Sequence, residues 1–158
     1  MQSRGDFVLQ YAVERWLLRR GEGYVITDLA KCAMSLAAAK VVGTKCYDLC
    51  QPFLERELAL LQPRAVIGIG TKAGGWLKAQ ALSPLVFQIA HYSVLGQAHW
   101  PKVDQRAKLP RLDKFQAFID QRRMETPMRS PRPIANKVDL RLLGVYRQQL
   151  AEIRRQSV

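Results

Sequence analysis

The spacing of apolar side chains predicts a helix followed by a strand near the N-terminus. Apolar pairs at 7–8, 11–12 and 16–17 recur at helical spacing, which indicates an amphipathic helix. Gly21 follows two arginines and is expected to end that helix. Residues 24–27 are aromatic and β-branched, so they predict a strand.

The middle of the chain continues as helix, strand, helix and strand. A second helix is expected to open at residues 50–54 and to end before Pro63. Residues 65–69 form a near-continuous apolar run, which is typical of a strand covered on both faces. A third helix is expected to start near Thr71, and residues 85–90 predict another strand. The apolar stripe of the second helix is expected to comprise Leu49, Phe53, Leu54, Leu58 and Leu61.

This alternation of strands and helices predicts an α/β domain with a parallel sheet. In open parallel sheets, ligands bind outside the carboxyl ends of the strands. Asp28, Gly70 and His91 each follow a predicted strand. These three residues are therefore expected at one edge of the sheet.

The C-terminal part carries two further helical patterns separated by a linker. Apolar residues at 112–119 predict a short helix, and residues 138–153 predict a final amphipathic helix. Residues 126–133 are basic and proline-rich, which is typical of a linker. We expect an α/β domain over 1–125 and a linker with a C-terminal helix over 126–158. The alternative is that this linker and helix form a tail that packs on a partner.

The charge of the chain indicates a polyanionic partner. The 158 residues hold 25 Lys+Arg against 13 Asp+Glu, a formal charge of +12, and residues 80–158 carry +8 of it. Such an excess attracts nucleic acid without sequence preference. DNA is the expected partner, and a basic surface without a specific partner is the alternative. The composition does not predict an oligomeric state.

The sequence indicates neither a membrane span nor a secretion signal. No apolar run reaches about eighteen residues, and residues 1–6 lack the apolar core of a signal peptide. We therefore expect a cytoplasmic protein. The odd number of cysteines argues against a disulfide framework in that compartment.

A set of short motifs resembles a known family. Lys31 and Cys32 follow the first predicted strand, residues 50–54 read Cys-Gln-Pro-Phe-Leu, and the next strand leads to Gly70 and Ala73. This order resembles the uracil-DNA glycosylase superfamily, above all its iron-sulfur branch (families 4 and 5).

The resemblance extends over residues 7 to about 102 and implies a three-layer α/β/α sandwich with a central parallel sheet. It also implies DNA binding and the excision of a damaged or deaminated base by hydrolysis of the N-glycosidic bond. The family opens with a strand and a first catalytic motif, and residues 1–23 do not resemble them. The chain is thus similar to a superfamily member that lacks both.

The candidates for chemistry are His91 and Asp28. Residues 91–93 stand where the superfamily has its His-Pro-Ser motif, and the resemblance implies that His91 donates a hydrogen bond to the departing base. The other interpretation is a histidine at a strand end, satisfied by backbone groups. Asp28 stands where the family has the asparagine that reads uracil, but a carboxylate only accepts hydrogen bonds. Asp28 is expected to read a base with an exocyclic amine, to activate water, or to cap the segment after the strand.

The residues after His91 are the candidates for DNA contact. The resemblance implies that Leu95 enters the minor groove as an apolar wedge and that Ser93 contacts a phosphate. The alternative for Leu95 is a packing role in the core. His99 and Lys102 lie close enough in the sequence to extend this surface. Trp100 either extends it further or fills the core.

Two weaker signals concern phosphate and metal. Gly70, Thr71 and Lys72 form a glycine-rich turn whose amides are able to hold a phosphate, although we favour a structural role.

Cys32 and Cys50 match two of the four thiolates that bind the cluster in the iron-sulfur branch, and Cys46 adds a third sulfur. The early Cys-x-x-Cys pair of the family is absent. We expect no resident cofactor and buried or free thiols, with an iron-sulfur cluster completed by an outside or non-cysteine ligand as the alternative.

The leading interpretation is a DNA-binding base-excision glycosylase. One alternative is a non-catalytic nucleic-acid-binding module on the same scaffold. The other is a nucleotide-binding α/β domain that uses the turn at residues 68–75.

Overall fold

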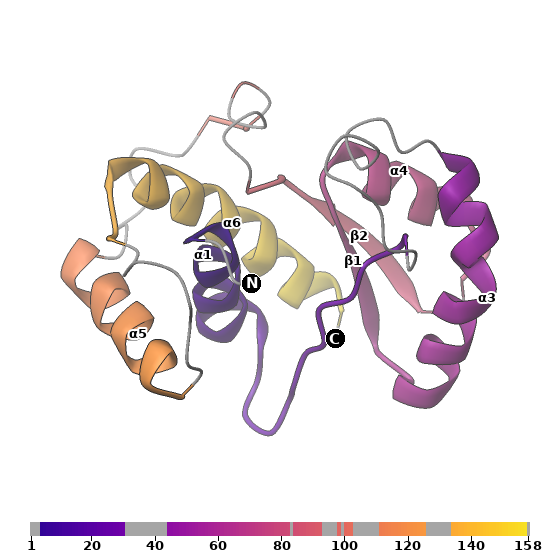
Figure 1. Ribbon diagram of the computed structural model, residues 1–158, viewed down its shortest axis with the longest axis horizontal. Helices are drawn as coiled ribbons and strands as arrows, with labels where there is room; N and C mark the ends of the chain where they lie inside the picture. The colour runs from indigo at the N-terminus through magenta and orange to yellow at the C-terminus, as the bar shows by residue number, and fades with distance from the viewer. Residues whose placement is uncertain are drawn as a thin grey trace. The chain divides into compact units, whose positions relative to one another are not determined.

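The chain folds into two compact units, which we describe separately (Figure 1). The computed structural model describes residues 4–30, 44–82, 84–92, 98, 100–102, 111–125 and 134–157. Residues 1–22 and 89–158 form one unit, called the helical unit, and residues 23–88 form the other, called the sheet unit. The expected division at residue 125 therefore falls inside the helical unit, because the C-terminal helix belongs with the N-terminal one.

The helical unit consists of α1 (Arg4–Ala12), η1 (Val13–Leu17), α5 (Leu112–Glu125) and α6 (Lys137–Gln156). The three predicted helices of this region are thus confirmed. The first one ends in a π-helical turn at Leu17, four residues before the glycine that was expected to end it. The chain closes this turn with a hydrogen bond from Leu18 N to Val13 O of 3.1 Å. Helix α1 packs against both α5 and α6.

The core of the helical unit follows from the apolar spacing of its helices. The largest fully buried side chains come from α1, α5 and α6. Tyr11 joins them at the edge, with its ring 5.4 Å from that of Phe115 in a T-shaped contact. The fully buried set comprises Phe7, Val8, Phe115, Ile119, Leu143, Val145, Tyr146 and Leu150.

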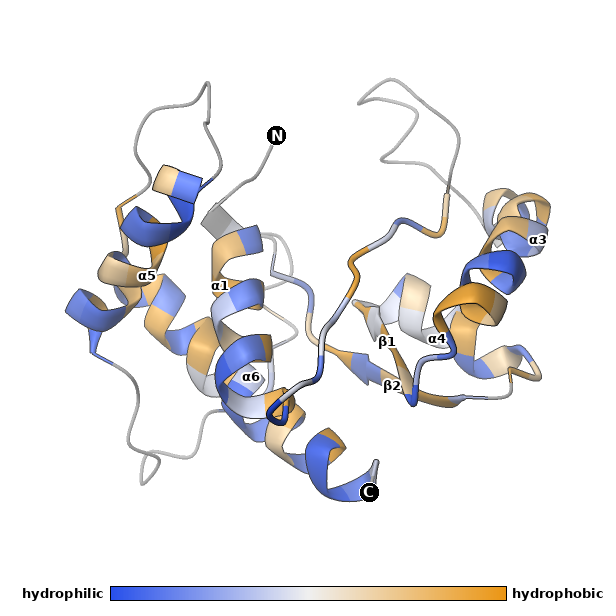
Figure 2. Cartoon of the chain, turned by 90° about the horizontal axis from the view of Figure 1, so that it is seen from below, coloured by the Kyte–Doolittle hydropathy of each residue, from blue (hydrophilic) through white to orange (hydrophobic). Residues whose placement is uncertain are grey.

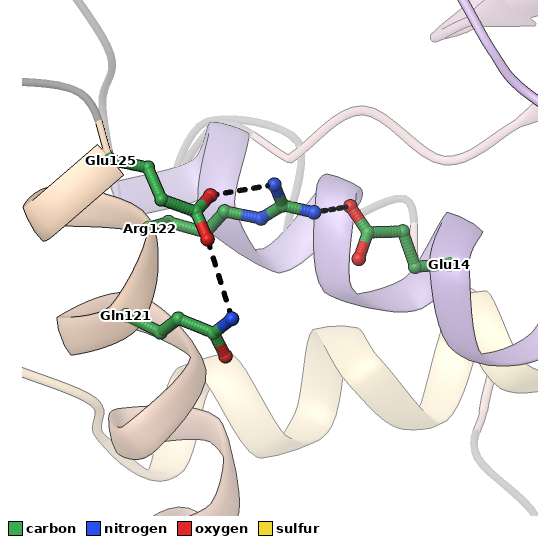
Figure 3. A network of polar contacts seen from close by, with 4 residues as sticks. All are labelled: Glu14, Gln121, Arg122 and Glu125. Carbon is green, nitrogen blue, oxygen red and sulfur yellow. Dashed lines mark hydrogen bonds and ion pairs between the residues drawn. The ribbon is translucent and has the colours of Figure 1, made fainter.

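Polar contacts fix the ends and the outer faces of these helices. Asn136 begins α6 with a capping box: its side chain accepts from the amides of Val138 and Asp139, and Asp139 accepts from the Asn136 amide at 2.8 Å. On the outer face of the helices, Arg122 of α5 forms ion pairs with both Glu14 and Glu125 (Figure 3).

The sheet unit is mixed α/β, as predicted. It contains α3 (Thr44–Leu61), β1 (Ala65–Ile69), α4 (Thr71–Ala79) and β2 (Leu85–Ile89), and β1 and β2 form a parallel two-stranded sheet. Both strands and the helix starting at Thr71 occupy the predicted positions. A helix crosses over between two parallel strands, which is the expected βαβ connection.

Two predictions for the sheet unit are wrong. Residues 24–27 are not a strand among the described residues; they belong to an irregular, exposed segment. Strand propensity depends on pairing and on a face to pack against, so four favourable residues do not suffice.

The apolar stripe predicted for α3 is also wrong in part. The helix begins before Cys50, where it was expected to open, and contains Pro52 in its interior. Leu54 and Leu58 face inward, as predicted, but Leu49, Phe53 and Leu61 are exposed. Tyr47 and Cys50 take their places on the inner side.

The core of the sheet unit is small. Leu54, Trp76 and Leu77 form its centre, and the indole N–H of Trp76 donates to Asp48 Oδ1 at 2.7 Å, which ties α4 to α3. A Cβ added to Gly68 would lie 2.5 Å from the Gly74 Cα, so β1 and α4 approach through their glycines. None of the described helices is both long and apolar enough to cross a membrane.

Candidate functional site

The two candidates for chemistry lie in different units. His91 follows β2 by two residues and belongs to the helical unit, whereas Asp28 belongs to the sheet unit. We therefore describe each candidate among the residues of its own unit.

Helix α6 holds the backbone directly before His91. The amide N–H of Ala90 donates to Gln149 Oε1 at 3.0 Å, and the hydroxyl of Tyr146 donates to the Ala90 carbonyl at 3.0 Å. Tyr146 is fully buried, and this burial raises its pKa, so the hydroxyl remains a protonated donor. The backbone N–H and the carbonyl of Ala90 are thus both hydrogen-bonded to side chains of α6.

Trp100 holds the backbone of His91 itself. Its indole N–H donates to the His91 carbonyl at 2.8 Å, and its side chain is only 6% exposed. The guanidinium carbon of Arg141, another α6 residue, lies 5.5 Å from the centroid of this ring. Trp100 therefore fills the core of the helical unit, which is one of the two roles considered for it.

The imidazole of His91 is exposed and stacks on Tyr92. The two ring centroids are 4.8 Å apart with an interplanar angle of 28°. Tyr92 packs against α1, where a Cβ added to Gly5 would lie 2.4 Å from the Tyr92 ring. The protein around the His91 ring removes part of its water, which lowers the pKa of His91 below its ordinary value. At neutral pH the ring is therefore a neutral imidazole, which is able to donate one hydrogen bond and to accept another.

Asp28 lies in the irregular, exposed segment that was predicted as a strand end. Its carboxylate has no hydrogen bond or ion pair with another residue in the described ranges. The neighbouring Thr27 donates from Oγ1 to Glu57 of α3, at 3.2 Å to the nearer oxygen. This contact attaches the segment to α3 but leaves the role of Asp28 a prediction.

Three of the predicted DNA-contact residues lie outside the described residues: Ser93, Leu95 and His99. Lys102, the fourth, is exposed in the helical unit.

The glycine-rich turn has a structural explanation. Gly70 caps α4 with φ of 88°, in the left-handed region that favours glycine, and Gly68 is required by the approach of α4 described above. Thr71 and Lys72 are exposed in the first turn of α4. The positive φ of Gly70 and the close packing at Gly68 therefore account for these two glycines without a bound phosphate.

The cysteines do not form a metal site among the described residues. Cys46 and Cys50 lie one turn apart on α3, and Cys32 lies outside the described ranges. No group of three or more His, Cys, Asp or Glu side chains with metal-binding geometry occurs in the part of the chain that the structure describes. The described residues thus give no support to an iron-sulfur cluster.

The helical unit carries most of the positive charge. It holds 18 Lys and Arg against 9 Asp and Glu, whereas the sheet unit holds 7 against 4. Several exposed cations of the helical unit have no ion pair with a described acid: Arg15, Arg20, Lys102, Lys114, Lys137, Arg141 and Arg154.

The residues that anchor His91 were not predicted from the sequence. The apolar spacing of residues 138–153 predicts a buried face for the last helix but not the hydrogen bonds of Tyr146 and Gln149. A polar Gln149 one turn after the buried Tyr146 was the available signal, but only the fold shows what it contacts. Trp100 was named without the hydrogen bond that it makes.

Comparison with protein-family models gave no match. Comparison with curated proteins and with solved structures gave no significant similarity. The resemblance of the motifs to uracil-DNA glycosylases therefore stays a prediction.

Proposed function

We propose that the protein binds DNA through its helical unit and presents His91 to a base of the bound strand. The observation that carries this proposal is the fixed and exposed position of His91 in the more basic of the two units. Tyr146, Gln149 and Trp100 hold the backbone on both sides of its Cα. Such a ring contacts a ligand at little cost in conformational entropy.

The charge supports a polyanionic ligand. An excess of nine positive charges in one unit, many on side chains without a described acid partner, favours phosphate contacts. The exposed ring of His91, stacked on the half-buried Tyr92, adds a surface on which a base is able to stack. Nucleic acid combines both features, because it carries phosphates and planar bases.

Binding is tested by fluorescence anisotropy with a labelled single-stranded oligonucleotide and a matched duplex at several salt concentrations. If the unit neutralises roughly five phosphates, log affinity falls with log salt at a slope of about −4 to −5 on the duplex. An affinity that does not change between low and physiological salt would remove nucleic acid as the partner.

Base excision is the activity that this arrangement would serve. A neutral imidazole at the base is able to donate an N–H to the departing base and to stabilise its developing negative charge. The lowered pKa of His91 favours that neutral form at physiological pH. The three-layer sandwich and the uracil-DNA glycosylase type of fold belong to this proposal, and so does the role of Asp28 in reading the base or activating water.

The activity is tested under single-turnover conditions on uracil-containing single strands. His91→Ala is expected to slow excision by about 10²- to 10³-fold if the ring acts like an oxyanion donor. DNA affinity of the same variant, measured in parallel, separates loss of chemistry from loss of binding. A protein that binds DNA but releases no base supports instead the non-catalytic binding module.

A further inference from the structure

The helical unit contains an exposed arginine that lies over an aromatic ring close to His91 in the fold. Arg141 is exposed on α6, and its guanidinium lies over the ring of the buried Trp100. A stacked guanidinium keeps its N–H donors in the plane of the group, where they are able to form paired hydrogen bonds with an oxyanion. The contact with the ring therefore does not use the N–H donors of the group.

Those donors have no acidic partner within the described ranges. The contact with Trp100 is the only hydrogen-bonding, ionic or ring interaction of the Arg141 side chain there. Other arginines of the same unit differ in this respect: Arg122 pairs with Glu14 and Glu125, and Arg155 pairs with Glu152. Arg141 thus retains an uncompensated charge on an ordered side chain.

The same indole joins Arg141 to the candidate site. One face of Trp100 lies under the guanidinium, and its N–H donates to the carbonyl of His91 at 2.8 Å. Helix α6 also supplies Tyr146 and Gln149, which hold Ala90. The positions of Arg141 and His91 are therefore set by the same helix and the same ring.

We infer that Arg141 binds a backbone phosphate of the strand whose base lies at His91. This inference rests on the proposed function and deepens it by assigning a phosphate contact that no sequence motif indicated. The ligand chemistry is a phosphodiester, recognised by the paired N–H groups of a guanidinium. Lys102, exposed two residues after Trp100, adds charge to the same segment.

The test compares two charge-conserving variants on one helix. Arg141→Lys keeps the charge but loses the planar fork and its stack, so affinity for a single-stranded oligonucleotide is expected to fall about tenfold. Arg155→Lys, at an exposed arginine of α6 whose charge pairs with Glu152, is expected to keep the affinity of the parent. Equal affinity in the parent and both variants would overturn the role of Arg141 and leave DNA binding by the unit intact.

A second measurement separates this inference from the proposed function. In the parent protein, the Nε–Hε resonance of Arg141, identified by its loss in Arg141→Lys, is followed by NMR during titration with inorganic phosphate. A saturable shift of this resonance supports the anion site, even if the parent fails to bind DNA and the proposed function falls. A resonance that does not move with either phosphate or oligonucleotide would overturn the inference.

Discussion

The two units of the chain differ in how completely they bury their apolar side chains. The helical unit contains Phe7, Phe115, Leu143 and Tyr146 at 0% exposure, whereas no residue in the central cluster of the sheet unit is fully buried. Of the eleven large hydrophobic residues that are exposed in the described ranges, eight belong to the sheet unit. Figure 2 shows such apolar residues in orange on α3.

This difference indicates why the candidate site belongs to the helical unit. The buried core of the helical unit positions α6 and Trp100. Side chains of α6 and the indole of Trp100 then form hydrogen bonds with the backbone of Ala90 and His91. The same unit carries a net +9, against +3 in the sheet unit. The unit with the more completely buried core is therefore also the more basic one.

The largest expected effect comes from truncating one phenylalanine in each unit. Phe115→Ala removes a ring at 0% exposure and is expected to lower the free energy of unfolding by about 4 kcal/mol. Phe53→Ala removes a ring that is 54% exposed on α3 and is expected to cost less than about 1 kcal/mol. Urea denaturation followed by circular dichroism measures both. Similar losses in the two variants would contradict the contrast between the buried ring of the helical unit and the exposed ring of the sheet unit.

The sheet unit has its own sensitive point where β1 meets α4. Gly68→Ala places a methyl group 2.5 Å from the backbone of Gly74 and is expected to cost about 2 to 3 kcal/mol. Gly75→Ala is the matched control, since its Cβ meets no atom within 4 Å and alanine favours the helix. Thermal unfolding of the two variants should move in opposite directions. A Gly68→Ala protein as stable as the parent would mean that β1 and α4 are not in this close contact.

A smaller effect is expected from removing one hydroxyl in each unit. Tyr146→Phe deletes the hydrogen bond to the Ala90 carbonyl and is expected to cost about 1 kcal/mol. Tyr47→Phe removes a hydroxyl of the sheet unit with no described hydrogen bond and is expected to be nearly neutral. The backbone amide resonance of His91 should shift in Tyr146→Phe only. An unchanged His91 resonance in that variant would contradict the role of α6 in positioning it.

The smallest effect is the pH dependence due to His91. Its pKa in the folded protein lies below that of the unfolded chain, about 6.5, so the unfolded chain binds more protons between these two values. The free energy of unfolding should therefore rise slightly with pH across this window, since the exposed ring is screened by solvent, and His91→Gln should remove that part of the slope. NMR titration of the two histidines gives the pKa directly. A His91 pKa at or above about 6.5 would contradict the expected desolvation.

Much of the secondary structure could be predicted from local patterns, and the failures have a common cause. Both strands, α4, α5 and α6 follow from apolar periodicity within one segment. Residues 24–27 also have strand composition, but a strand requires a partner that the segment itself does not specify. On α3, apolar residues occupy more than one face, so periodicity alone did not distinguish Leu49 and Phe53 from Tyr47 and Cys50.

The candidate site was predictable only in its central residue. His91 could be named because a short motif and a strand end coincide there. Its anchors lie 9 to 59 positions away along the chain from the groups that they bind, so no local pattern contains them. Arg141 could not be identified from the sequence for the same reason, because its proposed role depends on its contact with the ring of Trp100.

The central claim is that DNA binds the helical unit around His91, and chemical-shift mapping with a short single-stranded oligonucleotide tests it most directly. The account predicts that the largest amide shifts fall on residues 90–92, on Trp100 including its indole N–H, and on the part of α6 around Arg141. Amides of β1 and α4 should change little. Shifts concentrated in the turn at residues 68–75, or no saturable shifts in residues 90–92, would contradict it.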